Sequence, residues 1–330
     1  MTRAALICPG RGSYTEASLG CLPADHQWVR KAEEWRRKLE LEPLLQLDGA
    51  QRFEPQRHLR PANVSVLIYV KSMLDAAEAA REHDVVCVAG NSMGWYTALA
   101  VAGALDFEDG FLLVQHMALL QEEGEPGGQV LYPVVDETWN EDPELLDLVQ
   151  AALDSSGGEA HPSITLGGYR VLAGSPAGVT HLLQALPSLT LGKVTYPFRL
   201  AQHGPYHTSL AASVAERARE VLGDLAFHTP NIALVDGRGQ RFSPWSTDVD
   251  ALREYTHGAQ VVEPFDFSAS VRVCLREWAP ARLVLPGPGN SLGGVCGQVL
   301  VAEGWRGIRT RKDFTRVQEG ADPLLVSMGR

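Results

Sequence analysis

One stretch, residues 85–96, limits what this chain can fold into more than any other. A short apolar run, Val85 to Ala89, leads into Gly90-Asn91-Ser92-Met93-Gly94, and an Ala-rich apolar run, residues 97–104, follows it. A buried strand, a G-x-S-x-G turn and a helix in that order predict a nucleophile elbow, which raises a serine hydroxyl to the mouth of an α/β sheet. The alternative is an ordinary Gly/Ser turn. The strand before the pentapeptide and the helix after it favour the elbow.

The elements predicted around this elbow indicate an α/β fold with an inserted unit. Residues 4–8 and 282–285 resemble buried strands, and residues 64–82 form a helix with a broad apolar face. A polar, glycine-rich linker, residues 122–128, precedes a segment whose predicted order is β-α-β-β-α-β, the order of a ferredoxin-like unit. We therefore expect an α/β-hydrolase-like large subdomain with a parallel sheet, residues 1–127 and 199–330. Residues 128–198 are expected to form the inserted ferredoxin-like subdomain.

Composition excludes several classes of protein. The formal net charge of −11 argues against nucleic-acid binding, which needs a basic surface. The five cysteines are scattered, without a C-x-x-C pair, which argues against a disulfide framework or a zinc site. No signal peptide is visible and no apolar run is long enough to cross a bilayer. We expect a cytoplasmic, monomeric protein that holds no metal and does not associate with membranes.

A serine nucleophile needs a base within hydrogen-bond reach, and the chain offers ten histidines. His203 and His207 stand out because they lie in a loop with glycine and proline, where the inserted unit rejoins the large one. The residues alone do not choose between these two. Near the N-terminus, Gly10-Arg11-Gly12 follows the first strand; without a third glycine or a Walker lysine it indicates a strand-to-helix turn more than a phosphate site.

Four motifs in register resemble those of the malonyl-CoA:acyl carrier protein transacylase family, which includes the acyltransferase domains of polyketide and fatty-acid synthases. The matches cover nearly the whole chain. They are Pro9-Gly10-Arg11-Gly12-Ser13 for P-G-Q-G-S, Gly90 to Gly94 for G-H-S-x-G, Gly204-Pro205-Tyr206-His207-Thr208-Ser209-Leu210 for G-A-F-H-S-x-L, and Pro286-Gly287-Pro288-Gly289 through Leu292 for x-G-P-G-x-x-L.

The resemblance implies a Ser–His dyad, Ser92 and His207, and a ping-pong reaction. It further implies that the backbone N–H groups of Arg11 and Met93 form the oxyanion hole, and that the backbone carbonyl of Gln260 orients the histidine. Acyl-CoA and the phosphopantetheine thioester of an acyl carrier protein would be the substrates and partners, with no permanently bound cofactor. The pathway would be fatty-acid or polyketide biosynthesis.

The chain departs from the family at the acyl pocket. Members that use malonyl or methylmalonyl groups carry an arginine 25 residues after the serine, and that position is Met117 here. Because methionine cannot pair with a carboxylate, a neutral acyl group is predicted. The alternative is that Arg11, in place of the usual Gln, or Arg60 supplies the missing charge. The predicted acyl pocket comprises Met117, Tyr206, Asn91 and Arg60, with Asn91 replacing the usual His.

Three functions remain open on this basis. The first is an acyltransferase that moves a neutral, non-malonyl acyl group from acyl-CoA to acyl carrier protein through acyl-Ser92. The second is an acyl-thioester hydrolase of the proofreading type, in which water receives the same acyl group. The third is an inactive module that binds a carrier protein, which the presence of both Ser92 and His207 disfavours.

Overall fold

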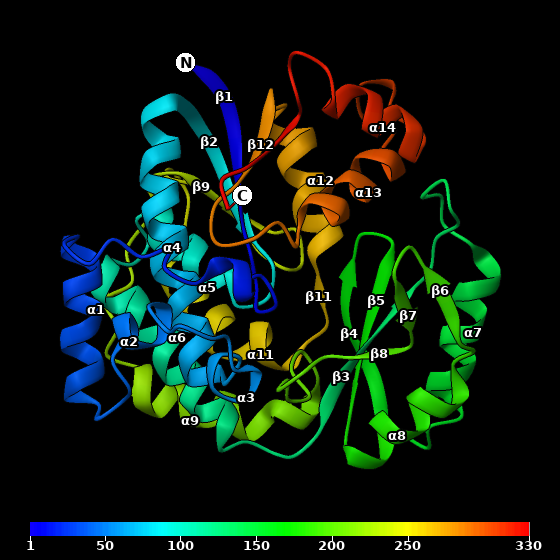
Figure 1. The fold of residues 1–330 in the computed structure, drawn as a ribbon, viewed down its shortest axis with the longest axis horizontal. Coiled ribbons are helices and arrows are strands. Elements are labelled where there is room, and N and C mark those ends of the chain that lie inside the picture. The colour runs from blue at the N-terminus through cyan, green and yellow to red at the C-terminus, as the bar shows by residue number, and fades with distance from the viewer. Residues whose placement is uncertain (330) are drawn as a thin grey trace.

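The computed structural model describes residues 1–329 and contains two main sheets, visible in Figure 1 at the centre and on the right. The first has six strands in the order β10-β9-β2-β1-β12-β13, and all neighbours run parallel except β9 and β10. Its strands are β1 (Thr2–Cys8), β2 (His83–Gly90), β9 (Ala233–Val235), β10 (Arg241–Phe242), β12 (Arg282–Leu285) and β13 (Leu325–Ser327).

Helices cover this sheet on both sides, as Figure 1 shows with α4 and α5 to the left of the strands and α12 and α13 to the right. Every side chain from Ala4 to Cys8 in the central strand β1 is buried, as expected for a parallel strand packed on both faces. The helices of this unit are α4 (Pro61–Glu82), α5 (Gly94–Val101), α6 (Phe107–Glu122), α9 (Ala212–Leu222), α10 (Val249–Glu254), α11 (Gln260–Val262), α12 (Phe267–Trp278), α13 (Gly293–Ala302) and α14 (Arg311–Gln318).

The second sheet has five strands in the order β11-β4-β5-β3-β8. Its elements follow the predicted β-α-β-β-α-β order, except that three short strands stand in place of one last strand: the hairpin β6–β7 and the edge strand β8. Pro197 stands between β7 and β8, where it cannot donate a ladder hydrogen bond. The elements are β3 (Gly128–Pro133), α7 (Pro143–Asp154), β4 (Ala160–Leu166), β5 (Tyr169–Gly174), α8 (Pro176–Ala185), β6 (Leu189–Leu191), β7 (Val194–Tyr196) and β8 (Phe198–Arg199).

The two sheets are joined by more than the linker. The strand β11 (Phe265–Asp266) comes from the later part of the chain and pairs in parallel with β4 of the second sheet. The β4–β5 turn is held by two further bonds, Gly167 N–H to Ser268 Oγ at 2.8 Å and Gly168 N–H to Gln298 Oε1 at 2.9 Å. The second sheet is therefore fixed to α12 and α13. The subdomain boundaries at residues 128 and 198 stay a prediction.

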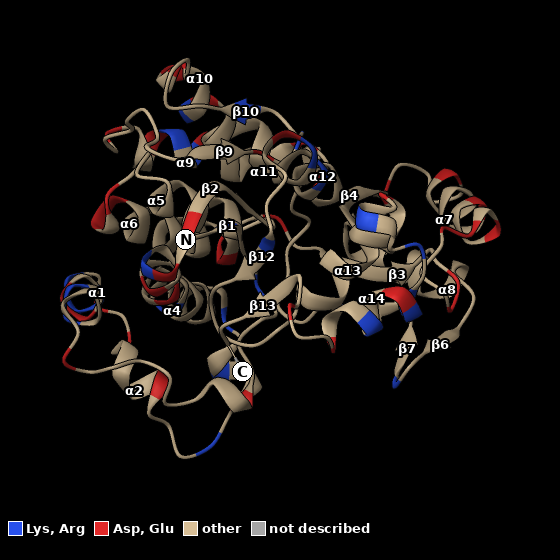
Figure 2. Cartoon of the chain, turned by 90° about the horizontal axis from the view of Figure 1, so that it is seen from above, with Lys and Arg blue, Asp and Glu red and all other residues tan. Residues whose placement is uncertain are grey.

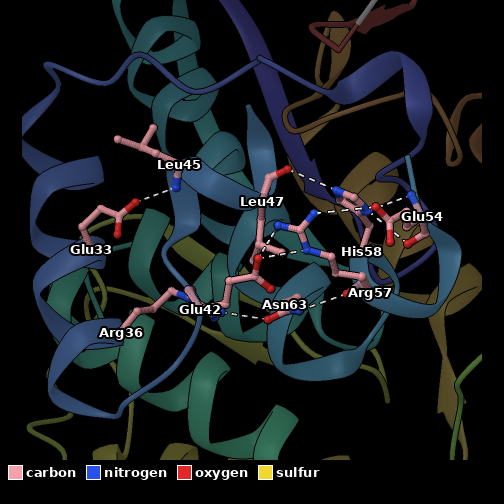
Figure 3. Close-up of polar contacts among 9 residues, drawn as sticks. All are labelled: Glu33, Arg36, Glu42, Leu45, Leu47, Glu54, Arg57, His58 and Asn63. Carbon is pink, nitrogen blue, oxygen red and sulfur yellow. Dashed lines mark hydrogen bonds and ion pairs between the residues drawn. The ribbon is translucent and has the colours of Figure 1, made fainter. Parts of the chain in front are cut away.

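Three short N-terminal helices, α1 (Gln27–Lys38), α2 (Leu44–Asp48) and α3 (Pro55–His58), precede α4, and a buried arginine on α1 fastens that helix to α4 and α6. Arg36 is fully buried and has no carboxylate partner. Its guanidinium instead donates to four oxygens at 2.5–2.9 Å: Glu42 O, Ala62 O, Gln115 Oε1 and Asn63 Oδ1. Figure 3 draws part of this network. The charge is thus accommodated by oriented dipoles, as a buried polar group requires.

Figure 2 shows acidic and basic positions interspersed along the helices and loops at the outside of the molecule. None of the helices in residues 1–329 combines the length and apolarity that a membrane crossing requires.

Candidate active site

The residues of the elbow adopt the sharp turn that the sequence predicts. Strand β2 ends at Gly90 and helix α5 begins at Gly94, and Ser92 between them has a left-handed backbone, φ 53°. A Cβ at Gly90 would collide with the backbone of Gly94, and a Cβ at Gly94 would collide with the carbonyl of Cys8 on the neighbouring strand. The two glycines are needed because the chain passes too close to itself for a side chain.

Ser92 and His207 are in hydrogen-bond contact, with 2.8 Å between Ser92 Oγ and His207 Nε2. On the other side of the ring, His207 Nδ1 lies 2.7 Å from the backbone carbonyl of Gln260. A carbonyl only accepts, so Nδ1 carries the proton and Nε2 is left to accept from the serine hydroxyl. The His207 side chain is fully buried, and this burial lowers its pKa to about 4 despite the Gln260 carbonyl. The imidazole is therefore neutral near pH 7, the state that a general base requires.

The side chain of Gln260 also holds the elbow, a role that the sequence reasoning missed. Its Nε2 donates to the backbone carbonyl of Ser92 at 3.2 Å, and its Oε1 accepts from the hydroxyl of Tyr96 at 2.6 Å. Gln260 directly follows a π-helical turn, Tyr255–Ala259, an irregularity that often occurs at functional sites. Tyr96, in the first turn of the helix after the serine, was the one sign of this role in the sequence. A buried tyrosine hydroxyl needs a hydrogen-bond partner, and Gln260 is that partner.

Two cavities meet at Ser92. The inner cavity, with about 20 Å³ of free space, is lined by Arg11, Ser65, Ser92, Met93, Tyr96, Val114, Met117, Ala118, Gln121, Tyr206 and Gln260. The outer cavity, of about 310 Å³, lies between the two sheets and is lined by Gly10, Arg11, Gly12, Asn91, Ser92, Gln129, Leu131, Ile164, Leu166, Tyr169, Val171, Tyr196, Leu200, His203, Tyr206, Ser291, Leu292 and Val295. A substrate can thus approach through the outer cavity and place a small group in the inner one.

Comparisons with known proteins identify relatives along almost the whole chain. No protein-family model matches the sequence. The malonyl CoA-acyl carrier protein transacylase of Haemophilus influenzae is 24% identical over 308 residues, which span 91% of this chain and 93% of the relative. That of Bacillus subtilis is 25% identical over 213 residues, 64% of this chain and 63% of the relative. This chain is a homologue of the malonyl-CoA:acyl carrier protein transacylases.

Solved structures of transacylases share the fold. The enzyme of Synechocystis matches with a TM-score of 0.76 at 18% identity, covering 100% of this chain and 98% of that one. A malonyl-transacylase solved in complex with its type II polyketide synthase acyl carrier protein matches with a TM-score of 0.73 at 22% identity, covering 91% of this chain and 93% of that one. The predicted fold class, a parallel α/β unit with a ferredoxin-like unit, is confirmed.

The predicted pocket residues of this transacylase homologue lie in three different places. Met117 and Tyr206 both line the inner cavity, and the Tyr206 hydroxyl donates to the Met117 carbonyl at 3.3 Å. Asn91 is buried in the wall of the outer cavity.

The placement of Arg60 in the acyl pocket needs correction. Arg60 lines neither cavity at Ser92; its guanidinium forms an ion pair with Glu122 at 2.7 Å on a more open hollow. Glu122 ends α6, and this pairing between distant segments draws the side chain away.

Arg11, in contrast, lines both cavities. Its guanidinium lies over the Tyr206 ring, 5.9 Å from the ring centre, and donates to the carbonyl of Gln202 over a long 3.4 Å. Desolvation lowers the pKa of Arg11 to about 10, so the side chain is still charged at neutral pH. Within residues 1–329 no carboxylate lies within ion-pair distance of it.

His203, the other candidate base, is not bonded to Ser92. It lines the outer cavity, and its Nδ1 is enclosed without a hydrogen-bond partner among residues 1–329. Burial, with Arg11 and His207 nearby, lowers the pKa of His203 well below its ordinary value. The residues alone did not choose between His203 and His207. The geometry favours His207.

Proposed function

We propose that this chain is an acyltransferase that moves an acyl group from a CoA thioester to the phosphopantetheine thiol of an acyl carrier protein, with acyl-Ser92 as the intermediate. The observation that carries the proposal is the continuous contact from Ser92 Oγ through the His207 ring to the Gln260 carbonyl, at 2.8 and 2.7 Å. The transacylase homologues, named for transfer of malonyl from CoA to acyl carrier protein, support the choice of donor and acceptor.

In the first half-reaction, Ser92 Oγ attacks the thioester carbon while His207 Nε2 takes the hydroxyl proton. The negative charge that forms on the thioester oxygen is stabilised by the backbone N–H groups of Arg11 and Met93. Collapse of the tetrahedral intermediate breaks the C–S bond, and His207 returns its proton to the departing CoA thiolate. The products are the Ser92 ester and free CoA.

In the second half-reaction the carrier protein's thiol enters by the outer cavity. His207, again neutral, takes the thiol proton, and the thiolate attacks the Ser92 ester carbon. The C–O bond to Ser92 breaks, and the proton on His207 passes to Ser92 Oγ. The enzyme is regenerated and the acyl group leaves as a carrier-protein thioester.

Two features of the inner cavity bear on the nature of the acyl group, and they support different answers. Met117, with Val114 and Ala118, forms an apolar wall without the family's arginine, and this supports a neutral acyl group. Arg11 in the same cavity supports an acyl group with a free carboxylate. The small free space, about 20 Å³, favours a short group in either case.

The proposal is tested by incubating the protein with a panel of acyl-CoAs, with and without acyl carrier protein, and following the intact mass of both proteins. We expect an acyl adduct on the wild type, its passage to the carrier protein, and no adduct on Ser92→Ala. Rapid release of free acid without loading of the carrier would show the hydrolase instead. No adduct with any thioester, in the wild type as in Ser92→Ala, would leave only the inactive binding module.

A further inference from the structure

A π-helical turn lies inside the helical segment that contacts the dyad. Helix α10 continues into this turn, Tyr255–Ala259, and the turn continues into α11. The N–H of Gln260 donates to the carbonyl of Tyr255, five residues back, where an α-helix would use the carbonyl four residues back. Such turns are rare, so contacts with the rest of the fold must hold this one in place.

The π turn changes which groups of the segment face the dyad. Because an α-helix rotates by about 100° per residue, one extra residue in a turn rotates everything that follows by about that angle. The residues directly after the turn are those that contact His207. The carbonyl of Gln260 lies 2.7 Å from its Nδ1, and the carbonyl of Val261 accepts from its backbone N–H at 2.8 Å. The register of the segment therefore determines whether these carbonyls reach the histidine.

Thr256, inside the π turn, makes two buried hydrogen bonds with one hydroxyl. The hydroxyl donates to the carbonyl of Leu252, four residues back, at 2.8 Å, and accepts from the indole Nε1 of Trp95 at 3.1 Å. In an uninterrupted α-helix the partner of that carbonyl would be the backbone N–H of residue 256. Thr256 and Trp95 are both fully buried, so water cannot replace either bond.

These contacts join the π turn to the helix that carries the elbow. Trp95 lies three residues after Ser92, and Thr256 lies four residues before Gln260. The first turn of α5 is thus bonded to the segment at two points, by Trp95 to Thr256 and by the hydroxyl of Tyr96 to Gln260 Oε1 at 2.6 Å. Two points of attachment fix both the distance and the rotation of the segment relative to the elbow.

We infer that Thr256 is a positioning residue for the reaction: by holding the π turn against α5, it places the Gln260 carbonyl on His207 so that the ring faces Ser92. The inference rests on the proposed function, since it takes Ser92 and His207 as the reacting pair. Thr256 lines neither cavity at Ser92, so it acts only through the residues that it holds.

The test first measures the reactivity of Ser92 with an alkyl fluorophosphonate. In this reaction a bond forms between Ser92 Oγ and phosphorus, the P–F bond breaks, the hydroxyl proton passes to His207, and fluoride leaves. Intact mass against time gives the rate constant. The probe needs the dyad but neither CoA nor a carrier protein. The second measurement is acylation by butyryl-CoA or malonyl-CoA, whichever acylates the wild type faster.

Thr256→Val removes the hydroxyl and keeps the shape of the side chain. Phosphonylation and the maximal acylation rate should fall about 10- to 100-fold, the effect of displacing reacting groups by about 1 Å. The half-saturating concentration of the thioester should not change, because the cavities are untouched. Thr256→Ser keeps the hydroxyl and should restore most of the rate.

Thr180→Val is the matched control. The Thr180 hydroxyl also donates to a carbonyl four residues back, that of Pro176, but it lies on α8 in the second sheet's unit and is exposed. This variant should react as fast as the wild type with both reagents.

A double-mutant cycle separates positioning from a general loss of packing. Tyr96→Phe removes the other bond between α5 and Gln260. If both side chains act through Gln260, Thr256→Val should lower the phosphonylation rate by a smaller factor in Tyr96→Phe than in the wild type, whereas independent effects would multiply.

The melting temperature of each variant shows whether it folds. Thr256→Val leaves the Leu252 carbonyl and the Trp95 indole unpaired, so it should melt below the wild type. If it does not fold, Trp95→Phe serves as the second variant. It removes only the indole donor and should give a smaller fall in the phosphonylation rate.

The contrary outcomes are distinct. Wild-type rates in a folded Thr256→Val, or effects that multiply fully in the cycle, would overturn the role of Thr256. A higher half-saturating thioester concentration with an unchanged maximal rate would also overturn it. If the fluorophosphonate modified Ser92 in the wild type but no CoA thioester did, the proposed function would fail, and the phosphonylation rates would still decide the role of Thr256. No reaction of Ser92 with either reagent would overturn both.

Discussion

At the scale of the residue, the surroundings of His207 determine its protonation state. Its ring is enclosed, its Nδ1 faces a backbone carbonyl rather than a carboxylate, and the cation Arg11 lies near it. A carboxylate partner would stabilise the imidazolium and raise the pKa, and the carbonyl does so only weakly. The base is therefore kept neutral over a wide range of pH.

This predicts an unusual pH dependence for the acylation of Ser92. Because the neutral imidazole is the active form and its pKa is lowered to about 4, the rate constant kcat/KM should be nearly constant from about pH 8 to about pH 5.5. It should decline only as the pH falls toward 4. The measurement is the acylation rate with a butyryl or malonyl thioester, in buffers where the melting temperature shows a folded protein. A half-maximal rate near pH 6.5 would contradict the structural account.

At the scale of the element, the elbow is a tight junction between a strand and a helix. Strand β2 turns into α5 within three residues, and the turn packs against the end of β1 so closely that only glycine fits at position 94. Gly294, in the first turn of α13, is a useful contrast. It is exposed, and a Cβ added there would meet nothing within 4 Å.

Alanine at these two glycines should have opposite effects. Gly94→Ala forces a Cβ against the carbonyl of Cys8 and should lower the free energy of unfolding by about 2–3 kcal/mol, with loss of the Ser92 adduct. Gly294→Ala restricts only the unfolded chain and should raise that free energy by about 0.5 kcal/mol. Urea denaturation measures both. A Gly94→Ala variant as stable as the wild type would show that the turn is looser than described.

The elements also show what the sequence could and could not foresee. The elbow, the strands of the parallel sheet and the order of the inserted unit follow from local patterns, and the dyad Ser92–His207 follows from motifs. Arg60 was misplaced because its partner Glu122 lies 62 residues away, on α6. The strand β11 and the contact of Gln260 with Tyr96 were missed for the same reason. Pairing between distant segments leaves no local pattern to recognise.

At the scale of the whole molecule, the outer cavity lies where the two units meet. Its lining comes from both units, with Leu292 and Ser92 from the first and Leu131, Ile164 and Val171 from the second. Ile164 and Val171 belong to the large buried core of the first unit, and the remaining core of the second unit forms a separate cluster. Several titratable side chains are buried in the folded protein, and their burial makes the stability of the fold depend on pH.

Four histidines with lowered pKa, His116, His203, His207 and His257, predict that acid destabilises the fold. His207 and His257 have pKa values of about 4, and that of His203 is well below its ordinary value, in each case mainly through burial. An unfolded histidine binds its proton near pH 6.5, so between about pH 6.5 and 4 the unfolded state holds more protons. The stability that these rings contribute is present above pH 6.5 and is lost as the pH falls through that window.

The melting temperature should therefore fall between pH 6.5 and pH 4, and less steeply in His257→Gln than in the wild type. His228→Gln, which changes an exposed histidine, is the matched control and should follow the wild-type curve. If His257→Gln and His228→Gln gave the same pH dependence, the buried ring of His257 would not be the cause.

The left-handed backbone of Ser92 and His207 affects which residues are favoured at these two positions. Seven residues other than glycine have a positive φ within residues 1–329, and Ser92, at 53°, and His207, at 60°, are two of them. Each conformation costs about 1–2 kcal/mol that glycine would avoid. For stability alone, glycine would be favoured at both positions. The serine and histidine found there are what the proposed acyl transfer requires, because glycine offers neither a nucleophile nor a base.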